Sequence, residues 1–484
     1  MARLRTSALI SMASQGTMLA VAFVRMAVVS RLLTPSEIGV FALASALMVL
    51  TRIIRIFGTW DYIVAQKEIT TEILRTCFTL LVLMALTMTA LFIFGADWLA
   101  GYLDAPDLRW LAPMMSVSFL VLSLGLVAQA TMSREMRFGQ LSIVRITAGI
   151  SDASLAVLLV VLGFGVESLA WGFVFAAFVS TGLIAFFEPR KILFRPSFHK
   201  MGEIIRFGGV SSLGAALNTM AEFGPTLLLG RLMDTASIGY YGRGQTLVSI
   251  IRQGIETTTA PVTQTWFAQK SRSDESELAE GYMKITGLLS AVTWPAYIFI
   301  IFNAATLVPF LLGEQWLPSV AITQALAIGA MFSAFSVYGM SLMVGTGQVG
   351  RRLQFNLVDQ SIRFAMLGFA VQWGLHAFAL AMGASFVVSF FLVGFFLRRD
   401  IQLSLRALVL SLTPSALLAL PVAAVNLIAQ EILFQTTRLG FWEFMGVTFA
   451  SGIAWLVTLI ALKHPLKDQA MDIIKIRRAR AKSS

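Results

Sequence analysis

Hydrophobic runs of about twenty residues follow one another along most of the chain, separated by short polar turns. A run of this length crosses about 30 Å of hydrocarbon as a helix, because each residue advances the helix by about 1.5 Å. A helix also satisfies its backbone polar groups without water. The runs are continuous and do not alternate with polar positions, so a β-barrel is not expected. The pattern predicts an all-α polytopic membrane protein.

We expect about fourteen transmembrane helices, with about twelve as the alternative count. The break between the eleventh and twelfth rests on Gly374 and His376, inside a longer hydrophobic stretch. The predicted spans are residues 8–29, 38–58, 76–95, 110–131, 143–163, 168–187, 206–229, 238–260, 282–304, 319–344, 357–375, 376–397, 405–428 and 441–462.

Two stretches of the chain resemble each other at a spacing of 200 residues. Residues 30–41 read SRLLTPSEIGVF, and residues 230–241 read GRLMDTASIGYY. An even number of predicted spans separates the two copies, so both insert with the same orientation. The repeat therefore predicts two six-helix lobes related in parallel, an arrangement in which transporters place the substrate between the halves. We divide the chain into an N-terminal lobe, a C-terminal lobe, two additional helices and a basic tail, at residues 1–200, 201–400, 401–464 and 465–484.

Composition and charge fix the expected orientation. Of the residues, 57% are hydrophobic and 13% charged, and the mean hydropathy is +0.79. If both termini are cytoplasmic, most basic residues fall inside, and the outer turns hold only Arg31, Arg109, Arg231 and Arg438. The net charge is +11, and the tail KIRRARAK at 475–482 suits anionic lipid headgroups better than nucleic acid.

Several classes of function lack their sequence signatures. The chain has no GxxxxGK[ST], HExxH or GxSxG motif, and its loops are too short to form a soluble catalytic domain. Cys77 is the single cysteine, which excludes a disulfide within the chain and a CxxC metal site. We therefore expect no enzyme, no metal and no cofactor. An ion gradient, the membrane potential or substrate consumption must then drive any transport.

Polar and ionisable side chains recur at three- and four-residue steps on four predicted spans, so each span carries a stripe along one face. Ionisable residues within a membrane are costly and usually face a bundle interior or a water-filled cavity. These stripes predict a shared central cationic cavity. On the first, second, seventh and eighth spans they include Arg25, Arg52, Arg55, Asn218, Glu222, Arg252 and Glu256.

Arg52 and Arg252 occupy equivalent positions in the two copies of the repeat, deep within their spans. No obligatory acid accompanies both, so the substrate is expected to supply their partner charge. Arg25 and Arg55 lie nearer to span ends, and either could instead extend to the headgroups.

Two other pairs of opposite charge lie within spans. Asp359 and Arg363 are four residues apart in the favourable order, and we expect them to neutralise each other on one helix. Arg145 and Asp152 form a looser version of the same arrangement.

Three motifs carry a resemblance to a known family. SRLLTPSEIGVFALA at 30–44, GRLMDTASIGYYGRGQTL at 230–247 and SREMRF at 133–138 resemble the polysaccharide transporter branch of the multidrug/oligosaccharidyl-lipid/polysaccharide exporter superfamily, the Wzx-type flippases. The resemblance covers nearly the whole chain. It implies two lobes around a central cavity, with two additional helices at 405–462.

The resemblance also implies a substrate and its contacts. The substrate would be an oligosaccharide linked to undecaprenyl pyrophosphate, an O-antigen, capsule or exopolysaccharide repeat unit, moved from the cytoplasmic to the periplasmic leaflet of a bacterial inner membrane. Arginines that meet the pyrophosphate in related lipid II flippases correspond to Arg25, Arg52 and Arg252. Glu222, together with Asn218 and Glu256, is the candidate site for a coupling H⁺ or Na⁺. A polysaccharide polymerase and chain-length machinery are the implied protein partners.

Three alternatives remain open. A lipid II flippase is a close sibling with the same expected architecture. A multidrug and toxin exporter of the same superfamily binds organic cations, and the excess of arginine over acids within the spans argues against it. A membrane polysaccharide polymerase or ligase should carry a large outer loop with catalytic residues, whereas the longest outer loop here, 96–109, is small.

Overall fold

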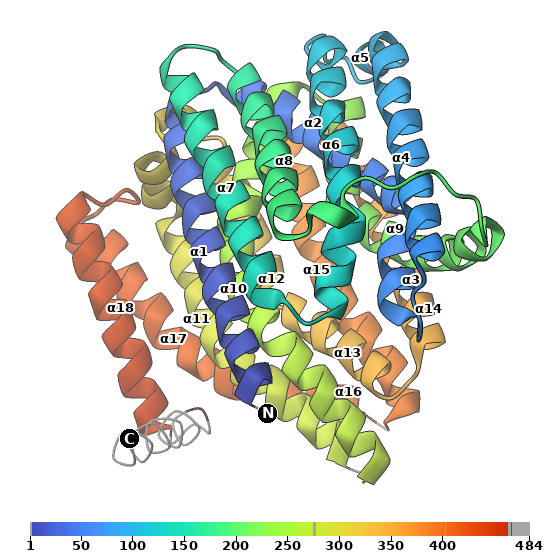
Figure 1. Ribbon diagram of the computed structural model, residues 1–484. Coiled ribbons are helices and arrows are strands. Elements are labelled where there is room, and N and C mark those ends of the chain that lie inside the picture. Colours follow the sequence, from blue (N-terminus) through green and yellow to red (C-terminus); the bar gives the residue numbers. More distant parts are fainter. Residues whose placement is uncertain (1, 274–276, 402, 463–465, 467–484) are drawn as a thin grey trace. The chain divides into compact units, whose positions relative to one another are not determined.

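The computed structural model describes residues 2–273, 277–401, 403–462 and 466 (Figure 1). Within these ranges the chain forms helices joined by turns, with no β-strand. The predicted all-α fold is confirmed. The basic segment at 475–482 lies outside the described residues.

The chain divides into two compact units, residues 1–242 and 243–484. The division falls within α10 (Thr235–Ser273), beyond the lobe boundary that we predicted at residue 200. The reason lies in α9 (Met201–Leu232), which packs against α2 (Pro35–Ile56) and α3 (Thr59–Ala65) of the first unit. The assignment of residues to two six-helix lobes stays a prediction.

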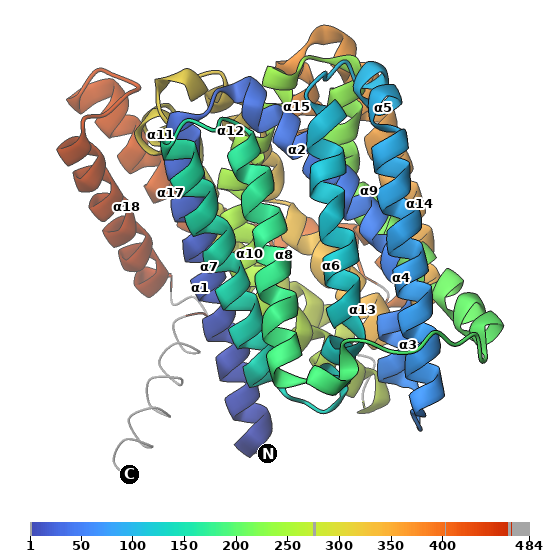
Figure 2. The same ribbon diagram turned by 45° about the horizontal axis from the view of Figure 1, so that its top comes forward.

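In the first unit α7 lies between α1 and α8, and α6 packs against both α4 and α8 (Figures 1 and 2). α2 contacts α6 on one side and α9 on another. Besides α2, α3 and α9, the elements are α1 (Ala2–Leu32), α4 (Thr71–Phe94), α5 (Ala96–Tyr102), α6 (Leu108–Arg134), α7 (Phe138–Val161), α8 (Glu167–Phe187) and the 3₁₀ turn η1 (Pro189–Lys191).

In the second unit α11 packs against α12 and α17, while α15 packs against α12 and α14. After α10 the elements are α11 (Leu278–Leu312), η3 (Glu314–Trp316), α12 (Ser319–Ala330), α13 (Ser333–Gly345), α14 (Val349–Ala370), η4 (Val371–Trp373), α15 (Leu375–Asp400), α16 (Leu405–Leu410), α17 (Thr413–Leu427), the π-helical turn η5 (Ile428–Leu433) and α18 (Phe441–Ala461).

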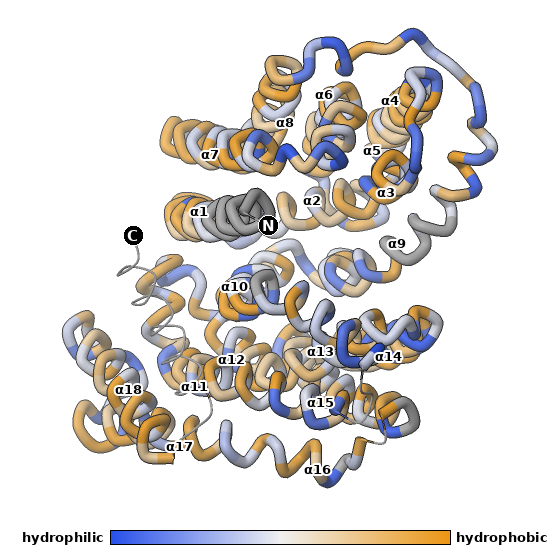
Figure 3. The backbone as a smooth tube through the Cα atoms, turned by 60° about the horizontal axis from the view of Figure 1, so that its bottom comes forward, coloured by the Kyte–Doolittle hydropathy of each residue, from blue (hydrophilic) through white to orange (hydrophobic). Residues whose placement is uncertain are grey.

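Ten helices of the described residues are long and apolar enough to cross a membrane, and the pair α12 and α13, bent by 43°, would make eleven. The long helices α9, α10 and α14 lie where spans were predicted but are not among them. They are more polar, and Figure 3 shows hydrophilic residues interrupting α14 while α17 and α18 are largely hydrophobic. Helices therefore occupy the predicted places, and a count of fourteen membrane crossings stays a prediction.

The two copies of the repeat begin helices by side-chain capping. Thr34 caps α2, because its hydroxyl accepts from the backbone N–H of Glu37 at 3.3 Å and its own N–H donates to the Glu37 carboxylate at 2.8 Å. Pro35 then occupies the first turn, where a missing N–H costs nothing. In the second copy Asp234 accepts from the N–H of Ser237 at 2.8 Å. Both turns thus start the helix that follows them.

These two turns also touch each other within the first unit. The hydroxyl oxygens of Ser36 and Thr235 are 2.6 Å apart. A Cβ on Gly39 would lie 1.7 Å from the carbonyl oxygen of Thr235, and a Cβ on Gly239 would lie 2.1 Å from that of Pro35. The two contacts are related by the 200-residue offset, as in a two-fold interface between like surfaces. We call this the repeat contact, and it places both turns at the same end of the unit, as the parallel repeat predicts.

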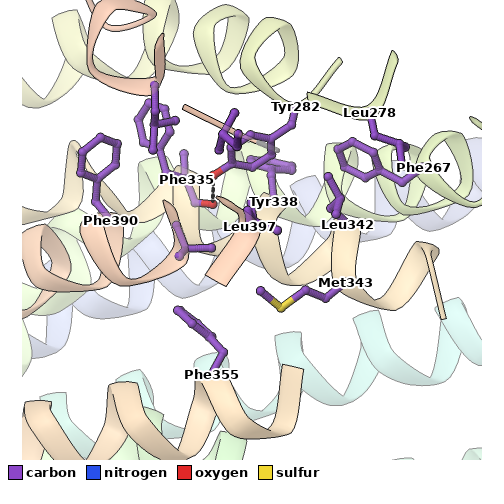
Figure 4. Packing of buried hydrophobic residues seen from close by; sticks show 14 residues of the cluster. Phe267, Leu278, Tyr282, Phe335, Tyr338, Leu342, Met343, Phe355, Phe390 and Leu397 are labelled. Atoms are coloured by element: carbon purple, nitrogen blue, oxygen red, sulfur yellow. Dashed lines mark hydrogen bonds between the residues drawn. The ribbon is translucent and has the colours of Figure 1, made fainter. Parts of the chain in front are cut away.

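An aromatic core fills the second unit between α10, α11, α13 and α15 (Figure 4). Phe335 and Phe390 meet edge to face with ring centroids 5.0 Å apart. The buried hydroxyl of Tyr282 donates to the carbonyl oxygen of Phe335 at 2.8 Å. Tyr338, fully buried in the same cluster, forms part of the wall of the cavity described below.

Candidate substrate and coupling site

Arg25 on α1 pairs with an acid on a neighbouring helix. Its Nη1 lies 2.5 Å from Oδ2 of Asp152 on α7, and its guanidinium lies 5.9 Å from the ring centroid of Phe41. About a fifth of each charged side chain is exposed, 22% for Arg25 and 20% for Asp152. The expected pairing of Asp152 with Arg145 is wrong, because Asp152 contacts Arg25 and Arg145 is exposed. Arg25 can therefore meet a substrate only by sharing or leaving Asp152.

Arg55 points into the helix packing of the first unit and is 3% exposed. Its Nη1 donates to the hydroxyl of Ser123 on α6 at 3.3 Å, and its guanidinium lies 5.6 Å from the ring centroid of Phe119. Its Nε is buried without a hydrogen-bond partner. Arg55 lies in the last turn of α2, but its side chain is buried against α6 and does not face an open surface.

Arg52, one turn earlier on α2, is exposed. Within the described part of the chain it forms no hydrogen bond or ion pair, and its charge repels that of Arg55. Two arginines three residues apart thus have opposite environments. Arg52 is the cation of the predicted set that is free to receive an anion.

Asn218 and Glu222 lie one turn apart on α9, so they share a face of that helix. Both side chains are exposed. The acid that contacts Arg25 is Asp152, on a different helix from Glu222.

Arg252 and Glu256 form an ion pair along α10, with Nη1 of the arginine 3.1 Å from Oε2 of the acid. The glutamate side chain is 15% exposed, and the arginine side chain is 35% exposed. We expected that no acid accompanies both Arg52 and Arg252, and of the two Arg252 does have an acidic partner, because Glu256 occupies the i+4 position on the same face.

A polar cavity opens beside this ion pair within the second unit. It is small, with room for about one water molecule. Thr293 is 6% exposed, and its hydroxyl is buried with no hydrogen-bond partner. The hydroxyl of Tyr338 is already paired with that of Thr259. The polar lining consists of Arg252 and Glu256 from α10, Thr293 and Tyr297 from α11, and Ser333 and Tyr338 from α13.

The pair Asp359 and Arg363 neutralises itself on α14, as predicted. Nη2 of Arg363 lies 3.1 Å from Oδ2 of Asp359, and both side chains are at most 10% exposed. Ser389 of α15 donates to the other carboxylate oxygen. This cluster has little need of an external partner.

The SREMRF motif joins the ends of helices in the first unit. Arg134 donates to the carbonyl oxygens of Ile63 and Lys67 at 3.1 and 2.8 Å, at the end of α3. Lys191 donates to Glu135 at 3.1 Å, and this hydrogen bond lowers the pKa of the Glu135 carboxyl. Arg137 binds Glu188, and that hydrogen bond raises the pKa of Arg137. The motif is therefore structural.

A family model described as "Polysaccharide biosynthesis protein" matches residues 28–321. The chain belongs to this family. Its relatives include the lipopolysaccharide biosynthesis protein WzxC of Escherichia coli K12, 22% identical over 92% of this chain and 90% of WzxC. The teichuronic acid biosynthesis protein TuaB of Bacillus subtilis 168 is 21% identical over 91% of this chain and 92% of TuaB. The succinoglycan biosynthesis transport protein ExoT of Rhizobium meliloti 1021 is 27% identical over 61% of this chain and 59% of ExoT.

Solved structures show the fold of this polysaccharide biosynthesis family member. The lipid II flippase MurJ in an inward closed conformation superimposes with a TM-score of 0.77 at 12% identity, over 95% of this chain and 99% of MurJ. An inward-facing multidrug resistance MATE transporter gives 0.56 at 17% identity, over 82% and 94%. The resemblance to Wzx-type polysaccharide flippases of this superfamily is confirmed.

Sequence reasoning found the arginines of this family member but missed most of their neighbours. Asp152 lies 127 residues from Arg25, and Thr293, Tyr297 and Tyr338 reach the cavity from helices other than that of Arg252. None of these residues follows the repeat or a helix spacing shared with its partner. Among these neighbours, Glu256 is the one whose contact could be predicted from the sequence, because it lies four residues from Arg252 on the same helix.

Proposed function

We propose that this chain is a flippase that carries an oligosaccharide linked to undecaprenyl pyrophosphate from the cytoplasmic to the periplasmic leaflet by alternating access. The relatives are polysaccharide biosynthesis and transport proteins, which supports a role in exporting polysaccharide repeat units. The observation that carries the finer proposal is Arg52, an exposed arginine on α2 without an acid among the described residues.

The charge of the proposed substrate suits these arginines. A pyrophosphate offers several oxygens to the forked N–H groups of arginine, which bind phosphate with two parallel hydrogen bonds. We assign Arg52 as the first contact. Arg25 joins it in the first unit when the substrate draws it from Asp152. In the second unit Arg252 is the candidate phosphate contact, once it has left Glu256. An inside-negative membrane potential of 100 mV favours the export of each negative charge by about 2.3 kcal/mol.

Alternating access needs an end that opens and closes, and the repeat contact is suited to that task. Because no side chain separates the two backbones at Gly39 and Gly239, the contact can exclude small molecules when closed. We assign this end to the periplasm and both termini to the cytoplasm. Asn218 and Glu222 are the candidates for a coupling-ion site in the first unit.

Reconstitution tests this function directly. The purified chain is placed in liposomes that contain a fluorescent undecaprenyl-pyrophosphate oligosaccharide, and a membrane-impermeant reductant added outside measures the fraction in the outer leaflet. Flipping by the chain should make nearly all of the probe accessible, while empty liposomes protect about half. A probe with a neutral headgroup should not be flipped, so about half of it should stay protected, as in liposomes without protein. Equal flipping of both probes would contradict recognition of the pyrophosphate.

The alternative functions predict different results in the same assay. A lipid II flippase would move lipid II in preference to a polysaccharide repeat unit. A multidrug exporter would move an organic cation and neither lipid. A polymerase or ligase would change the length of the oligosaccharide, which chromatography of the recovered lipid detects.

A further inference from the structure

We propose that Glu256 is the proton-binding residue of the second unit, which releases Arg252 to a substrate phosphate and takes up a proton in its place. The proposal deepens the proposed function and rests on it. It concerns the cavity between α10, α11 and α13, where this ion pair lies.

The first argument is the position of the ion pair. The Arg252 side chain is 35% exposed, whereas the Glu256 side chain is only 15% exposed. A phosphate that approaches from the mouth of the cavity therefore meets the arginine before it meets the acid. The arginine can turn to the phosphate, but the glutamate remains inside.

The second argument is the charge that would be left behind. With Arg252 in place the pair is neutral. Once a phosphate has taken the guanidinium, Glu256 would be a carboxylate in a poorly solvated site without a counter-ion, which is costly. Protonation of Glu256 lowers this free-energy cost, because it removes the negative charge that Arg252 no longer balances.

The described residues that line the cavity supply no cation to Glu256 other than Arg252. From its own helix it faces Arg252 and Ile255; from α11 it faces Leu289, Thr293 and Tyr297; and from α12 and α13 it faces Ala330, Ser333, Ala334 and Tyr338. Among these lining residues the cation is Arg252, and the remaining titratable groups are two tyrosines. The buried hydroxyl of Thr293, which has no partner, can accept a hydrogen bond from a protonated Glu256 or from a water between them.

A metal cation fits the cavity less well than a proton does. Hard cations bind about six oxygen ligands. Here the hydroxyl of Ser333 already donates to the carbonyl of Ala330, and those of Tyr338 and Thr259 pair with each other. The lining offers such a cation a single carboxylate and otherwise neutral hydroxyls, whereas one proton is enough to neutralise Glu256.

The exchange makes substrate binding and proton binding favour each other, because coupling between two ligands is reciprocal. Calorimetric titration of the purified full chain with geranyl pyrophosphate, in two buffers that differ in ionisation enthalpy, measures protons taken up per ligand bound. We expect the wild type to take up as much as one more proton than Glu256→Gln. The variant should bind the probe at least about threefold more tightly, because its Arg252 need not separate from a carboxylate before it binds the phosphate.

Two controls separate this exchange from other effects. Glu431→Gln makes the same chemical change at an exposed position of η5 and should keep the proton uptake of the wild type. Sodium chloride, compared with choline chloride at fixed pH, should not strengthen binding.

The outcomes test the proposed substrate and the proton exchange separately. If the wild type does not bind geranyl pyrophosphate, both the proposed substrate and this exchange fail. If it binds but Glu256→Gln takes up as many protons, the exchange is wrong and the proposed function stands. Sodium-dependent binding without proton uptake would also overturn the exchange.

Discussion

Arg25 and Arg252 each have a carboxylate partner, whereas Arg52 has none among the described residues and Arg55 is buried against Ser123. These arginines occupy three different electrostatic states on three helices. In the proposed function the paired ones are held in neutral clusters until the substrate anion arrives, because a buried charge without a partner is costly. The exposed one can attract the anion first.

The pair between Arg25 and Asp152 should behave as a unit. Asp152→Ala leaves Arg25 without its acid, which costs about 3–5 kcal/mol in a fully buried site. Because both side chains are about a fifth exposed, 22% and 20%, we expect about 2 kcal/mol here. The double variant Arg25→Ala with Asp152→Ala should regain much of the loss. Thermal unfolding of the single and double variants in detergent measures the coupling.

A stability loss in the double variant equal to the sum of the two single losses would mean that the two charges do not interact. Arg145→Ala serves as the control, because Arg145 is an exposed arginine on the same helix as Asp152. It should leave the unfolding temperature unchanged.

At the scale of the helices, the sequence predicts well that a helix forms and roughly which residues it contains, because a long continuous hydrophobic run is compatible with few other structures. It predicted spans at α9, α10 and α14 as well, although these helices are more polar and are not in the apolar set. It does not show which helices are neighbours. The environment of Arg25 depends on the contact between α1 and α7. The hydrophobic periodicity of these two helices does not predict that contact.

The repeat contact should depend on the absence of a side chain. In Gly39→Ala the new Cβ would lie 1.7 Å from a backbone oxygen of Thr235, so the two turns must separate. Disulfide formation between Ser36→Cys and Thr235→Cys, in a Cys77→Ala background, measures their proximity. We expect rapid cross-linking with Gly39 present and a loss of at least about tenfold in rate in the alanine variant.

Gly242→Ala is the matched control, because a Cβ there meets nothing within 4 Å on the same helix as Thr235. It should cross-link like the parent. Unchanged cross-linking in Gly39→Ala would show that the turns do not need the close approach.

At the scale of the whole molecule, the two units belong to one chain whose family and fold are shown, whereas its orientation in the membrane is a prediction. The repeat carries the strongest sequence signal at this scale, since it predicted that both turns lie at one end, and the contact of Ser36 with Thr235 bears this out. The proposed substrate leaves no comparable pattern, because a pyrophosphate would need only a few arginines.

Labelling from outside the cell tests the orientation. Single cysteines at Ser36 and Ser237, in the Cys77→Ala background, should react with a membrane-impermeant maleimide in intact cells. A cysteine at Ser273, at the other end of α10, should react only after the membrane is made permeable. Labelling of Ser273→Cys in intact cells, or opposite results at the first two positions, would contradict the proposed topology.

The central claim is that an arginine-bound pyrophosphate is what this chain moves, and Arg52→Ala tests it most directly. Arg52 is exposed and makes no ion pair among the described residues, so its removal should leave the fold and the protein level unchanged. In a strain that depends on this chain, lipid-linked repeat units should accumulate on the cytoplasmic leaflet and export should fall at least about tenfold. Arg52→Lys should restore part of it, because lysine keeps the charge but lacks the fork. Arg190→Ala, an exposed cation outside the long helices, should export normally. Export by Arg52→Ala at the parental rate would contradict the account.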